Sequence, residues 1–419
     1  MISHCKCFVE ISCNCLTYNV GMTSSYYRLL RLTLLPLALL MLSCAPAATP
    51  SKQSPAPIVS ATTVSTAMPE VTPAIPAGFM AADGSRPLTF PADLGAHPDF
   101  RTEWWYYTGN LQQTPDGRHF GFELTIFRVG LLPPTAELPS DSTWAGRDVY
   151  FAHFAVSDIG AEKFYAFQRY SRPGPGLAGA EANPYHVWLE DWNITERAPG
   201  VYQLQAEQEG ISLDLKLTDE MGVVLQGENG YSRKGKSPTN ASYYYSQPRL
   251  RADGFIQVGD DRYAVNGLAW NDHEFSTSVL DENQIGWDWF SMQFEDGRAL
   301  MLFQLRERDG NTSDASSGTF ITADGTTQSL HKPDFEIDVL DTRRSPHTPA
   351  VYPSSWKIRI DRFDCLLDVQ PWMADQELNF PPITYWEGAV RFEGACAGVP
   401  VQGNGYIELT GYSGTIPIQ

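Results

Sequence analysis

The segment from Trp270 to Ser276 reads Trp-Asn-Asp-His-Glu-Phe-Ser and places one imidazole between two carboxylates and beside two aromatic rings. An imidazole exchanges protons near neutral pH, and a carboxyl group does so when its surroundings raise its pKa. General acid–base catalysis uses these groups. We therefore interpret His273 and Asp272 as candidate catalytic residues. The alternative is a polar cluster that only stabilises the junction between two domains.

If this segment is a strand, its side chains divide between two faces, because successive side chains of a strand alternate. Asp272 and Glu274 would then share a face with Trp270, while His273 would point the other way with Phe275. His273 would need a hydrogen-bond partner from another strand. The segment is therefore expected to supply half of a site.

Two residues from other strand-like runs could complete a site with His273, and we include both among the candidate catalytic residues. Glu103 lies in Thr102–Leu111, and His153 lies in Asp148–Asp158. A buried carboxylate is costly unless it is paired. Glu103 could instead anchor the fold by pairing with an arginine, and His153 could be an ordinary core histidine.

Aromatic side chains crowd around these positions and could bind an apolar ligand. Both faces of the run around Glu103 are aromatic, which is typical of a strand between a core and a cavity. The expected ligand-binding residues are Trp104, Trp105, Tyr107, Trp270, Glu274, Phe275, Trp287 and Trp289. The alternative is that these rings form ordinary hydrophobic core.

The elements that must position these residues read as short β-strands. Runs rich in aromatic and β-branched residues recur about every ten residues between Gly, Pro, Asn and Asp, and long amphipathic helices are missing from the pattern. The sequence predicts an all-β protein with two consecutive sandwich or barrel domains, residues 85–272 and 273–419. Cys365 and Cys396 fall in separate strands of the second domain, and a disulfide between them is left open.

The N-terminal region has the features of an export signal followed by a linker. Residues 1–44 resemble a secretory signal, with Met22 as a candidate start of translation, and Leu42-Ser43-Cys44 resembles a bacterial lipoprotein signal. Cys44 is therefore the expected lipidation site, and a simple secretory signal is the alternative. Residues 45–84, rich in Pro, Ala, Ser and Thr over most of their length, are expected to form a disordered linker.

The amino-acid composition limits the classes of partner that the protein is expected to bind. A formal charge of −19 over 419 residues argues against binding nucleic acid through its phosphates. No cofactor or metal ion is expected, because the early cysteines lack further ligands that would complete a folded metal site. The expected partners are a hydrophobic small molecule, the membrane through a lipid on Cys44, and an envelope transporter. The chain is expected to cross the cytoplasmic membrane and stay at the cell envelope.

Several motifs together resemble one known family. Phe90-Pro-Ala-Asp-Leu-Gly-Ala-His-Pro, Glu103-Trp-Trp-Tyr, Trp270-Asn-Asp-His-Glu-Phe-Ser and Gly286-Trp-Asp-Trp-Phe are similar to motifs of the AttH-like family, often labelled predicted secreted hydrolases and related to carotenoid 1,2-hydratases. The resemblance implies two lipocalin-like β domains with a ligand cleft between them or within the first. It also implies hydratase-type chemistry, although Phe275 stands where the hydratases have tryptophan.

These observations lead to three functional hypotheses. The first is a lipid-anchored protein that binds an isoprenoid or lipid-like molecule. The second is an enzyme of the hydratase, hydrolase or cyclase type that performs acid–base chemistry on such a molecule. The third is an accessory lipoprotein of an envelope transport complex. The hydrolase label has little support, because the sequence contains neither G-x-S-x-G nor H-E-x-x-H.

Overall fold

The computed structural model describes residues 75–414 except 116, 139, 143 and 279. The described part lies within one compact unit, residues 68–419. The proposed signal, Cys44 and most of the linker lie outside the described residues. Among the described residues, no helix is long and apolar enough to cross a membrane.

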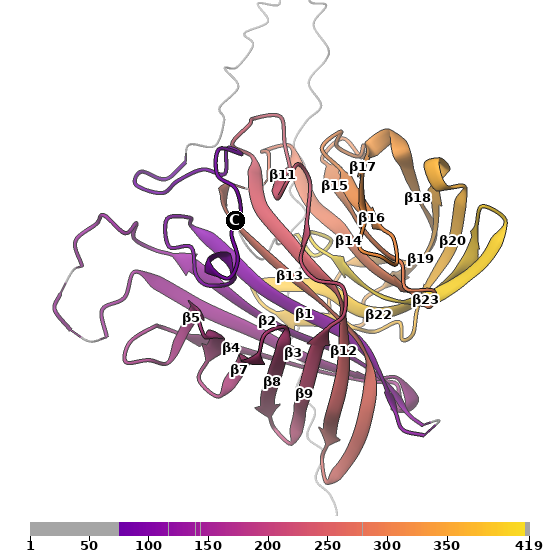
Figure 1. Cartoon of the computed structure of the whole chain (residues 1–419), viewed down its shortest axis with the longest axis horizontal. Helices are drawn as coiled ribbons and strands as arrows, with labels where there is room; N and C mark the ends of the chain where they lie inside the picture. Colours follow the sequence, from indigo (N-terminus) through magenta and orange to yellow (C-terminus); the bar gives the residue numbers. More distant parts are fainter. Residues whose placement is uncertain (1–74, 116, 139, 143, 279, 415–419) are drawn as a thin grey trace, which may run out of the picture. The chain divides into compact units, whose positions relative to one another are not determined.

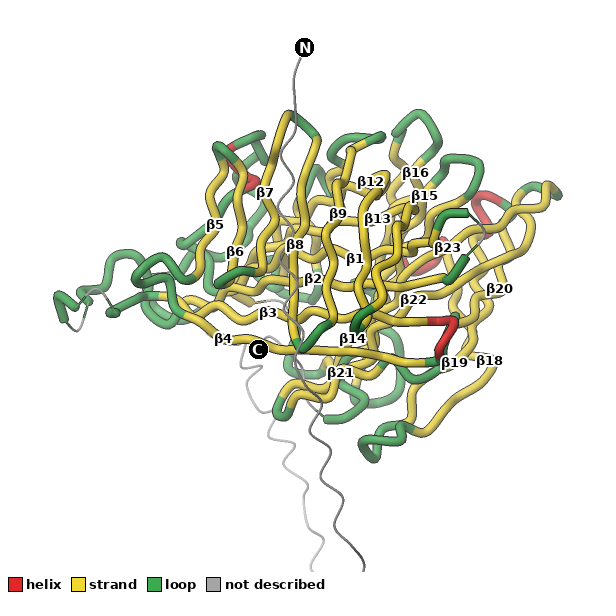
Figure 2. Tube along the Cα trace, turned by 90° about the horizontal axis from the view of Figure 1, so that it is seen from below, coloured by secondary structure: helices red, strands yellow, loops and turns green. Residues whose placement is uncertain are grey.

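The prediction of an all-β fold is confirmed. Helical structure in the described part consists of short 3-10 turns, which are η1 (Ala92–Leu94), η2 (Ile159–Ala161), η3 (Lys332–Asp334) and η4 (Asp361–Phe363). The strands form two large antiparallel sheets, drawn in Figure 1 and, from below, in Figure 2.

The first sheet has the strand order β4-β3-β2-β1-β13-β12-β9-β8-β7-β6-β5, and β10 and β11 pair with β12 at its side. Its strands are β1 (Thr102–Gln113), β2 (His119–Gly130), β3 (Asp148–Asp158), β4 (Lys163–Ser171), β5 (Ala178–Ala182), β6 (Tyr185–Leu189), β7 (Trp192–Ala198), β8 (Val201–Gln208), β9 (Ile211–Asp219), β10 (Val224–Leu225), β11 (Tyr231–Arg233), β12 (Ala241–Val258) and β13 (Asp261–Ser278).

The second sheet has the order β17-β16-β15-β14-β23-β22-β20-β19-β18, and β21 pairs with β22. Its strands are β14 (Gln284–Phe294), β15 (Ala299–Glu307), β16 (Ser317–Ile321), β17 (Thr327–His331), β18 (Phe335–Arg344), β19 (Val351–Ile360), β20 (Cys365–Pro371), β21 (Glu377–Phe380), β22 (Ile383–Cys396) and β23 (Val399–Leu409).

The chain changes from one sheet to the other between Ser278 and Gln284. The boundary expected near residue 272 therefore falls inside β13, which continues as part of the first sheet for six more residues. The segment that we expected at a junction is the last strand of the first sheet, paired with β1 on one side and β12 on the other.

Side chains fill the interior of the first sheet, which curls on itself. One buried cluster joins Trp105 of β1 and Phe154 of β3 with Val187 of β6 and Leu204 of β8, strands that are far apart in the order of the sheet. The second sheet has its own core around Phe290 and Trp356. The curled interior of the first sheet is therefore occupied by its own side chains.

A third buried cluster lies where the two sheets face each other. Tyr106, Tyr244 and Trp270 come from the first sheet, and Trp289 and Phe303 come from the second. Figure 1 shows the strands that meet there, with β1 and β2 next to β22 and β23, in agreement with contacts between β1 and β23 and between β2 and β22.

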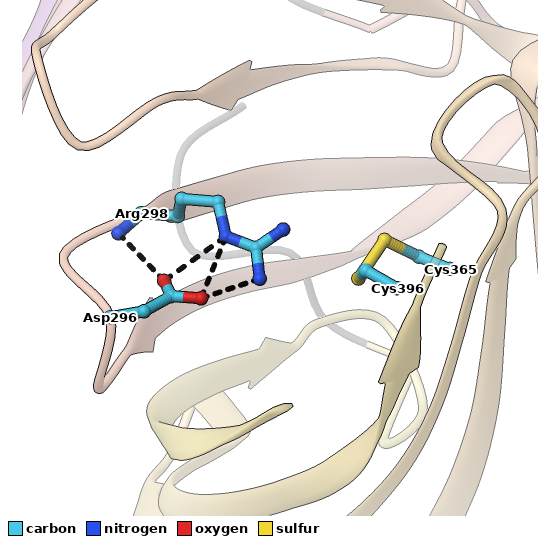
Figure 3. The surroundings of a disulfide bond; sticks show 4 residues. All are labelled: Asp296, Arg298, Cys365 and Cys396. Carbon is cyan, nitrogen blue, oxygen red and sulfur yellow. Dashed lines mark hydrogen bonds and ion pairs between the residues drawn. A yellow bond between two sulfur atoms is a disulfide. The ribbon is translucent and has the colours of Figure 1, made fainter. Parts of the chain in front are cut away.

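A disulfide joins the two cysteines whose pairing the sequence left open. Cys365 at the start of β20 and Cys396 at the end of β22 are directly opposite each other and are bonded (Figure 3). The same view shows the ion pair between Asp296 and Arg298 in the turn that joins β14 to β15. The disulfide therefore links two neighbouring strands of the second sheet.

Candidate functional site

The register of β1 against β13 divides the predicted site residues into two groups. Trp105 is opposite His273, and Tyr106 is opposite Asp272. Residues opposite each other in an antiparallel pair share a face. His273 thus shares the face that carries Trp105 into the core of the first sheet, while Asp272 shares the face of Tyr106 toward the second sheet. The structure thus confirms the predicted alternation of side chains between the two faces of this segment.

His273 and Glu103 belong to a closed, buried network. His273 Nε2 lies 2.8 Å and His97 Nδ1 lies 2.6 Å from Glu103 Oε1. The Nε group of Arg128 donates to Glu103 Oε2 at 2.9 Å. The outer ring nitrogens are also used, because His97 Nε2 is 2.8 Å from Asp93 Oδ1 and His273 Nδ1 is 2.9 Å from the hydroxyl of Tyr245.

Opposite charges stabilise this network. Burial by itself would raise the pKa of Glu103, but His97, Arg128 and His273 hold that pKa well below its ordinary value. Burial would likewise lower the pKa of His97, and the carboxylates of Glu103 and Asp93 raise it instead. For His273 burial prevails over the pull of Glu103, so its pKa is lowered.

The network attaches the loop that precedes β1 to the first sheet. His97, Asp93 and Phe100 belong to the loop before β1, and one nitrogen of Arg128 donates at 2.7 Å to the backbone oxygens of both His97 and Phe100.

His97, Glu103 and His273 also have the side-chain types of a metal site, with ligand atoms within 4.8 Å of one another. Their N–O separations of 2.6 and 2.8 Å are hydrogen-bond lengths, and Arg128 adds a positive charge beside them. This geometry supports a role in stabilising the fold.

His153 does not join that network. Its Nδ1 lies 2.6 Å from the hydroxyl of Tyr385 on β22, and its Nε2 lies 2.7 Å from the side-chain nitrogen of Gln168. Burial lowers the pKa of His153 to about 3, so the ring is neutral at physiological pH. The contact with Tyr385 connects the first sheet to the second.

A narrow pocket lies between the two sheets and contains the other predicted residues. Its volume is about 60 Å³, smaller than the roughly 300–1,000 Å³ of common small-molecule pockets. Its walls are mainly aromatic and also carry four acidic or basic side chains, Lys234, Asp272, Glu274 and Glu408, and the hydroxyls of three tyrosines. It is lined by Trp104, Tyr106, Phe127, Lys234, Tyr244, Asp272, Glu274, Leu280, Trp287, Trp289, Phe303, Leu305, Tyr385 and Glu408.

Four of the eight expected ligand-binding residues line this pocket, namely Trp104, Glu274, Trp287 and Trp289. Trp270 lies just behind the wall, where its ring nitrogen donates to Asp272 at 2.7 Å and its ring packs against Trp289. Trp105, Tyr107 and Phe275 lie elsewhere because strand alternation directs them into hydrophobic cores of the first sheet. A larger open groove of about 1060 Å³ borders β11 and β16, and none of the predicted site residues lines it.

Asp272 is a buried carboxyl group whose proton affinity is increased. Burial raises its pKa to about 7, against the opposing effect of its hydrogen-bond donors, Ser246, Tyr244 and Trp270. A carboxyl group with this pKa exists in both protonation states near neutral pH, which is the property that a general acid or base needs.

Glu408 of β23 is the second such group, and the sequence analysis missed it. Burial raises its pKa to about 8, helped by the negative charges of Glu123, Glu274 and Asp272. The ring nitrogen of Trp287 donates to Glu408 Oε2 at 2.7 Å. Asp272 and Glu408 therefore face one pocket from the two different sheets.

Two further acids lie behind the tyrosines of the pocket wall. Tyr106 donates to Glu387 of β22, and Tyr385 donates to Glu123 of β2 at 3.3 Å. Burial raises the pKa of Glu123 to about 7 and that of Glu387 well above its ordinary value. Among the described residues, Glu123 Oε2 and Glu387 Oε2 have no hydrogen-bond partner.

The sequence contained one usable sign of these missed acids. Glu123, Glu387 and Glu408 each lie directly after apolar or aromatic residues within a strand, as in Tyr406-Ile-Glu-Leu409. A lone carboxylate at such a position is costly to bury and therefore suggests a site. No pattern within the sequence indicates that Glu408 shares a pocket with Asp272.

The fold and the pocket define a class of two-sheet β proteins with acidic and aromatic side chains between the sheets. The chain belongs to the AttH-like family, whose model matches residues 81–412. A search of curated proteins finds no significant match.

Two solved structures share the fold. One is an AttH candidate from Nitrosomonas europaea, which is 37% identical, with a TM-score of 0.70, and the match covers 80% of this chain and 100% of that one. The other is a kievitone hydratase from Nectria haematococca, which is 15% identical, with a TM-score of 0.60, and the match covers 80% of this chain and 96% of that one. The second likeness concerns the fold alone.

Proposed function

We propose that the pocket between the sheets binds an apolar, unsaturated small molecule and catalyses acid-dependent addition to its C=C bond. The observation that carries this proposal is the position of Asp272 and Glu408, two carboxyl groups with pKa values of about 7 and 8, in one aromatic pocket. The name of the kievitone hydratase with the same fold refers to addition of water, which agrees with this reaction class.

Aromatic rings support the binding part of the proposal. Trp104, Trp287 and Trp289 present ring faces and edges around the two acids. Such rings bury apolar ligands and stabilise a positive charge that lies over their faces. Trp104 and Trp287 are only half-buried, so their movement is the simplest way for the narrow pocket to admit a ligand.

The two acids suit different roles. Glu408, with the higher pKa, is the better proton donor at neutral pH, and Asp272 ionises more readily and can act as the base. In the first step the O–H bond of Glu408 breaks, and the π electrons of the ligand form a new C–H bond, which leaves a carbocation at the other carbon. In the second step a water molecule forms the C–O bond and gives a proton to Asp272. Proton exchange with solvent then restores both groups.

Isotope incorporation tests this proposal. The purified protein is incubated with a panel of unsaturated isoprenoids in D₂O and, separately, in H₂¹⁸O, and products are analysed by mass spectrometry. We expect one non-exchangeable deuterium and one ¹⁸O in the product, both lost in Glu408→Gln and retained in Glu393→Gln, an exposed glutamate on β22. If panel members bind but neither isotope is incorporated, the protein binds these molecules without converting them, and the proposed reaction is refuted.

Export and lipid anchoring at Cys44 form a separate proposal that is supported by the sequence. A Cys44→Ser variant is expected to move from the membrane fraction to the soluble fraction and to lose incorporation of a labelled fatty acid. Equal membrane association of both forms would contradict it. The accessory role in an envelope transport complex stays a prediction, which a pull-down with the lipid-anchored protein would test.

A further inference from the structure

Lys234 is a buried lysine whose side chain ends in the pocket. It follows β11, and its side chain is only 7% exposed. The ammonium nitrogen lies 3.9 Å from the ring centre of Phe303 and 4.9 Å from that of Tyr244. Both rings line the pocket, as Lys234 itself does, so the ammonium group borders the ligand space.

The backbone of Lys234 is held on both sides. Its N–H donates to the carbonyl of Asn240 at 2.8 Å, and its carbonyl accepts from the side chain of Gln284 at 2.7 Å. Gln284 lies at the start of β14. The lysine is therefore fixed to both sheets, which is expected of a residue that must present its charge at a defined place.

Among the described residues, the ammonium group of Lys234 makes no aligned hydrogen bond. An ammonium carries three N–H groups. Its acidic neighbour is Glu274, with 3.2 Å between Nζ and Oε1, but Glu274 Oε1 has no hydrogen-bond partner among the described residues, so this ion pair lacks hydrogen-bond alignment. The remaining contacts of the ammonium group in the pocket are with aromatic rings. An ammonium N–H that faces the pocket without an aligned acceptor can bind a ligand oxygen.

Charge balance selects the kind of oxygen. Lys234 and Glu274 already neutralise each other, so an anionic ligand group would add an unpaired charge to a buried site. A neutral carbonyl oxygen accepts the free N–H without adding charge. With the carbonyl oxygen at the ammonium group, the apolar part of the ligand and its C=C bond would lie against the aromatic walls of the pocket.

We infer that the ligand is an unsaturated apolar molecule with a neutral carbonyl group, and that Lys234 binds the carbonyl oxygen and so orients the C=C bond. This inference rests on the proposed function, since it assigns the ligand class of the same pocket. Lys234 is a specificity-determining residue in this arrangement. A lysine that only stabilises the fold would affect stability but would not change the preference among ligands.

Binding of three matched probes tests the inference without turnover. The probes are geranylacetone, the diene in which its C=O is replaced by CH₂, and geranylacetic acid. Quenching of tryptophan fluorescence reports binding, because Trp104, Trp287 and Trp289 line the pocket. We expect the ketone to bind about tenfold more tightly than the diene, as for a hydrogen bond to a charged group, and the acid to bind no more tightly than the ketone.

Variants separate recognition from stability. Lys234→Met should bind ketone and diene equally, and Lys234→Arg should keep the preference. Lys236→Met, at an exposed lysine two residues further on, should behave as the wild type. If Lys234→Met fails to fold, Lys234→Met with Glu274→Gln removes the ion pair without leaving a lone carboxylate, and it should show the same loss of preference.

Each outcome has a separate meaning. A wild type that binds ketone and diene equally, or a preference that survives in Lys234→Met, overturns the inference while leaving the proposed function intact. Binding of the acid tenfold more tightly than the ketone overturns the neutral-carbonyl assignment. Failure of all three probes to bind counts against the pocket as an isoprenoid site, and therefore against the proposed function itself.

Discussion

At the scale of single residues, the two pocket acids differ in what their protonation would do. Asp272 accepts from Ser246, Tyr244 and Trp270, and these bonds favour its charged form. The donor to Glu408 is the ring nitrogen of Trp287, and the carboxylates around it disfavour its charged form. Similar burial therefore produces two groups suited to opposite steps of one reaction.

The pH dependence of turnover should follow these two groups. Below pH 7 Asp272 becomes protonated and cannot accept a proton, and above pH 8 Glu408 ionises and cannot donate one. We expect a bell-shaped profile of kcat/KM with its maximum between these values. Glu408→Gln and Asp272→Asn should each reduce kcat about 100-fold or more, as for loss of a general acid or base. A flat profile would exclude this pair.

Removing a member of the His97–Glu103–His273 network should mainly affect stability. Glu103→Gln leaves Arg128 and His97 without their buried carboxylate, which is expected to lower the free energy of unfolding by about 3 kcal/mol. Urea denaturation measures this loss, and Glu393→Gln serves as the exposed control. A Glu103→Gln protein of normal stability without turnover would instead make Glu103 catalytic.

At the scale of elements, β1 and β13 explain which parts of the site could be predicted. Alternation alone assigned Asp272 and Glu274 to one face and His273 to the other, and the register confirms that division. The direction of a strand's two faces is a local property, so the sequence shows it. Whether a face meets a core or a pocket depends on the partner sheet, so the sequence alone could not show that Trp105 and Tyr107 pack into the core of the first sheet.

The second sheet contributes what the sequence could not reveal. Glu408 lies on β23, more than 100 residues after Asp272, and shares a pocket with it only because the sheets pack face to face. No periodicity within one strand carries that information. The all-β fold was predictable since it depends on strand patterns and turns, whereas the inter-sheet pocket depends on long-range packing.

The disulfide should stabilise the second sheet without acting on the pocket acids directly. Cys365 and Cys396 are separated by 31 residues in sequence, and closing a loop of this size stabilises a protein by about 3–4 kcal/mol in the chain-entropy model. The double variant to serine should lower the unfolding free energy by a comparable amount while ligand binding at low temperature persists. If the double variant folds but no longer binds the ligand, the disulfide also shapes the pocket.

At the scale of the whole molecule, the buried acids link stability to pH. The pKa of Asp272 rises from 3.8 to about 7 on folding, and that of Glu408 rises from 4.5 to about 8. Both contributions are present in full below the unfolded values and are lost as pH rises through the folded values. Ionisation of these two buried carboxyl groups therefore lowers the free energy of unfolding as the pH rises.

A double variant measures this linkage. The free energy of unfolding of the wild type should fall more between pH 5 and about pH 8.5 than that of Asp272→Asn with Glu408→Gln, because the amides do not ionise. The other titrating groups, including His97 and Glu103, are common to both proteins and cancel in the comparison. Equal pH dependence would mean that the two acids are ionised in the folded protein.

The position of Glu408 on β23 also sets the order in which the protein acquires its pocket. Asp272 and its hydrogen-bond donors are present once the first sheet has formed, whereas β23 is the last described strand in the chain. During synthesis or export from the N-terminus, the first sheet can therefore fold with an aromatic and acidic surface that is still uncovered. The pocket is complete only when the C-terminal strands cover this surface. A chain that ends before β22 would lack Glu408 and would leave aromatic side chains of the first sheet exposed.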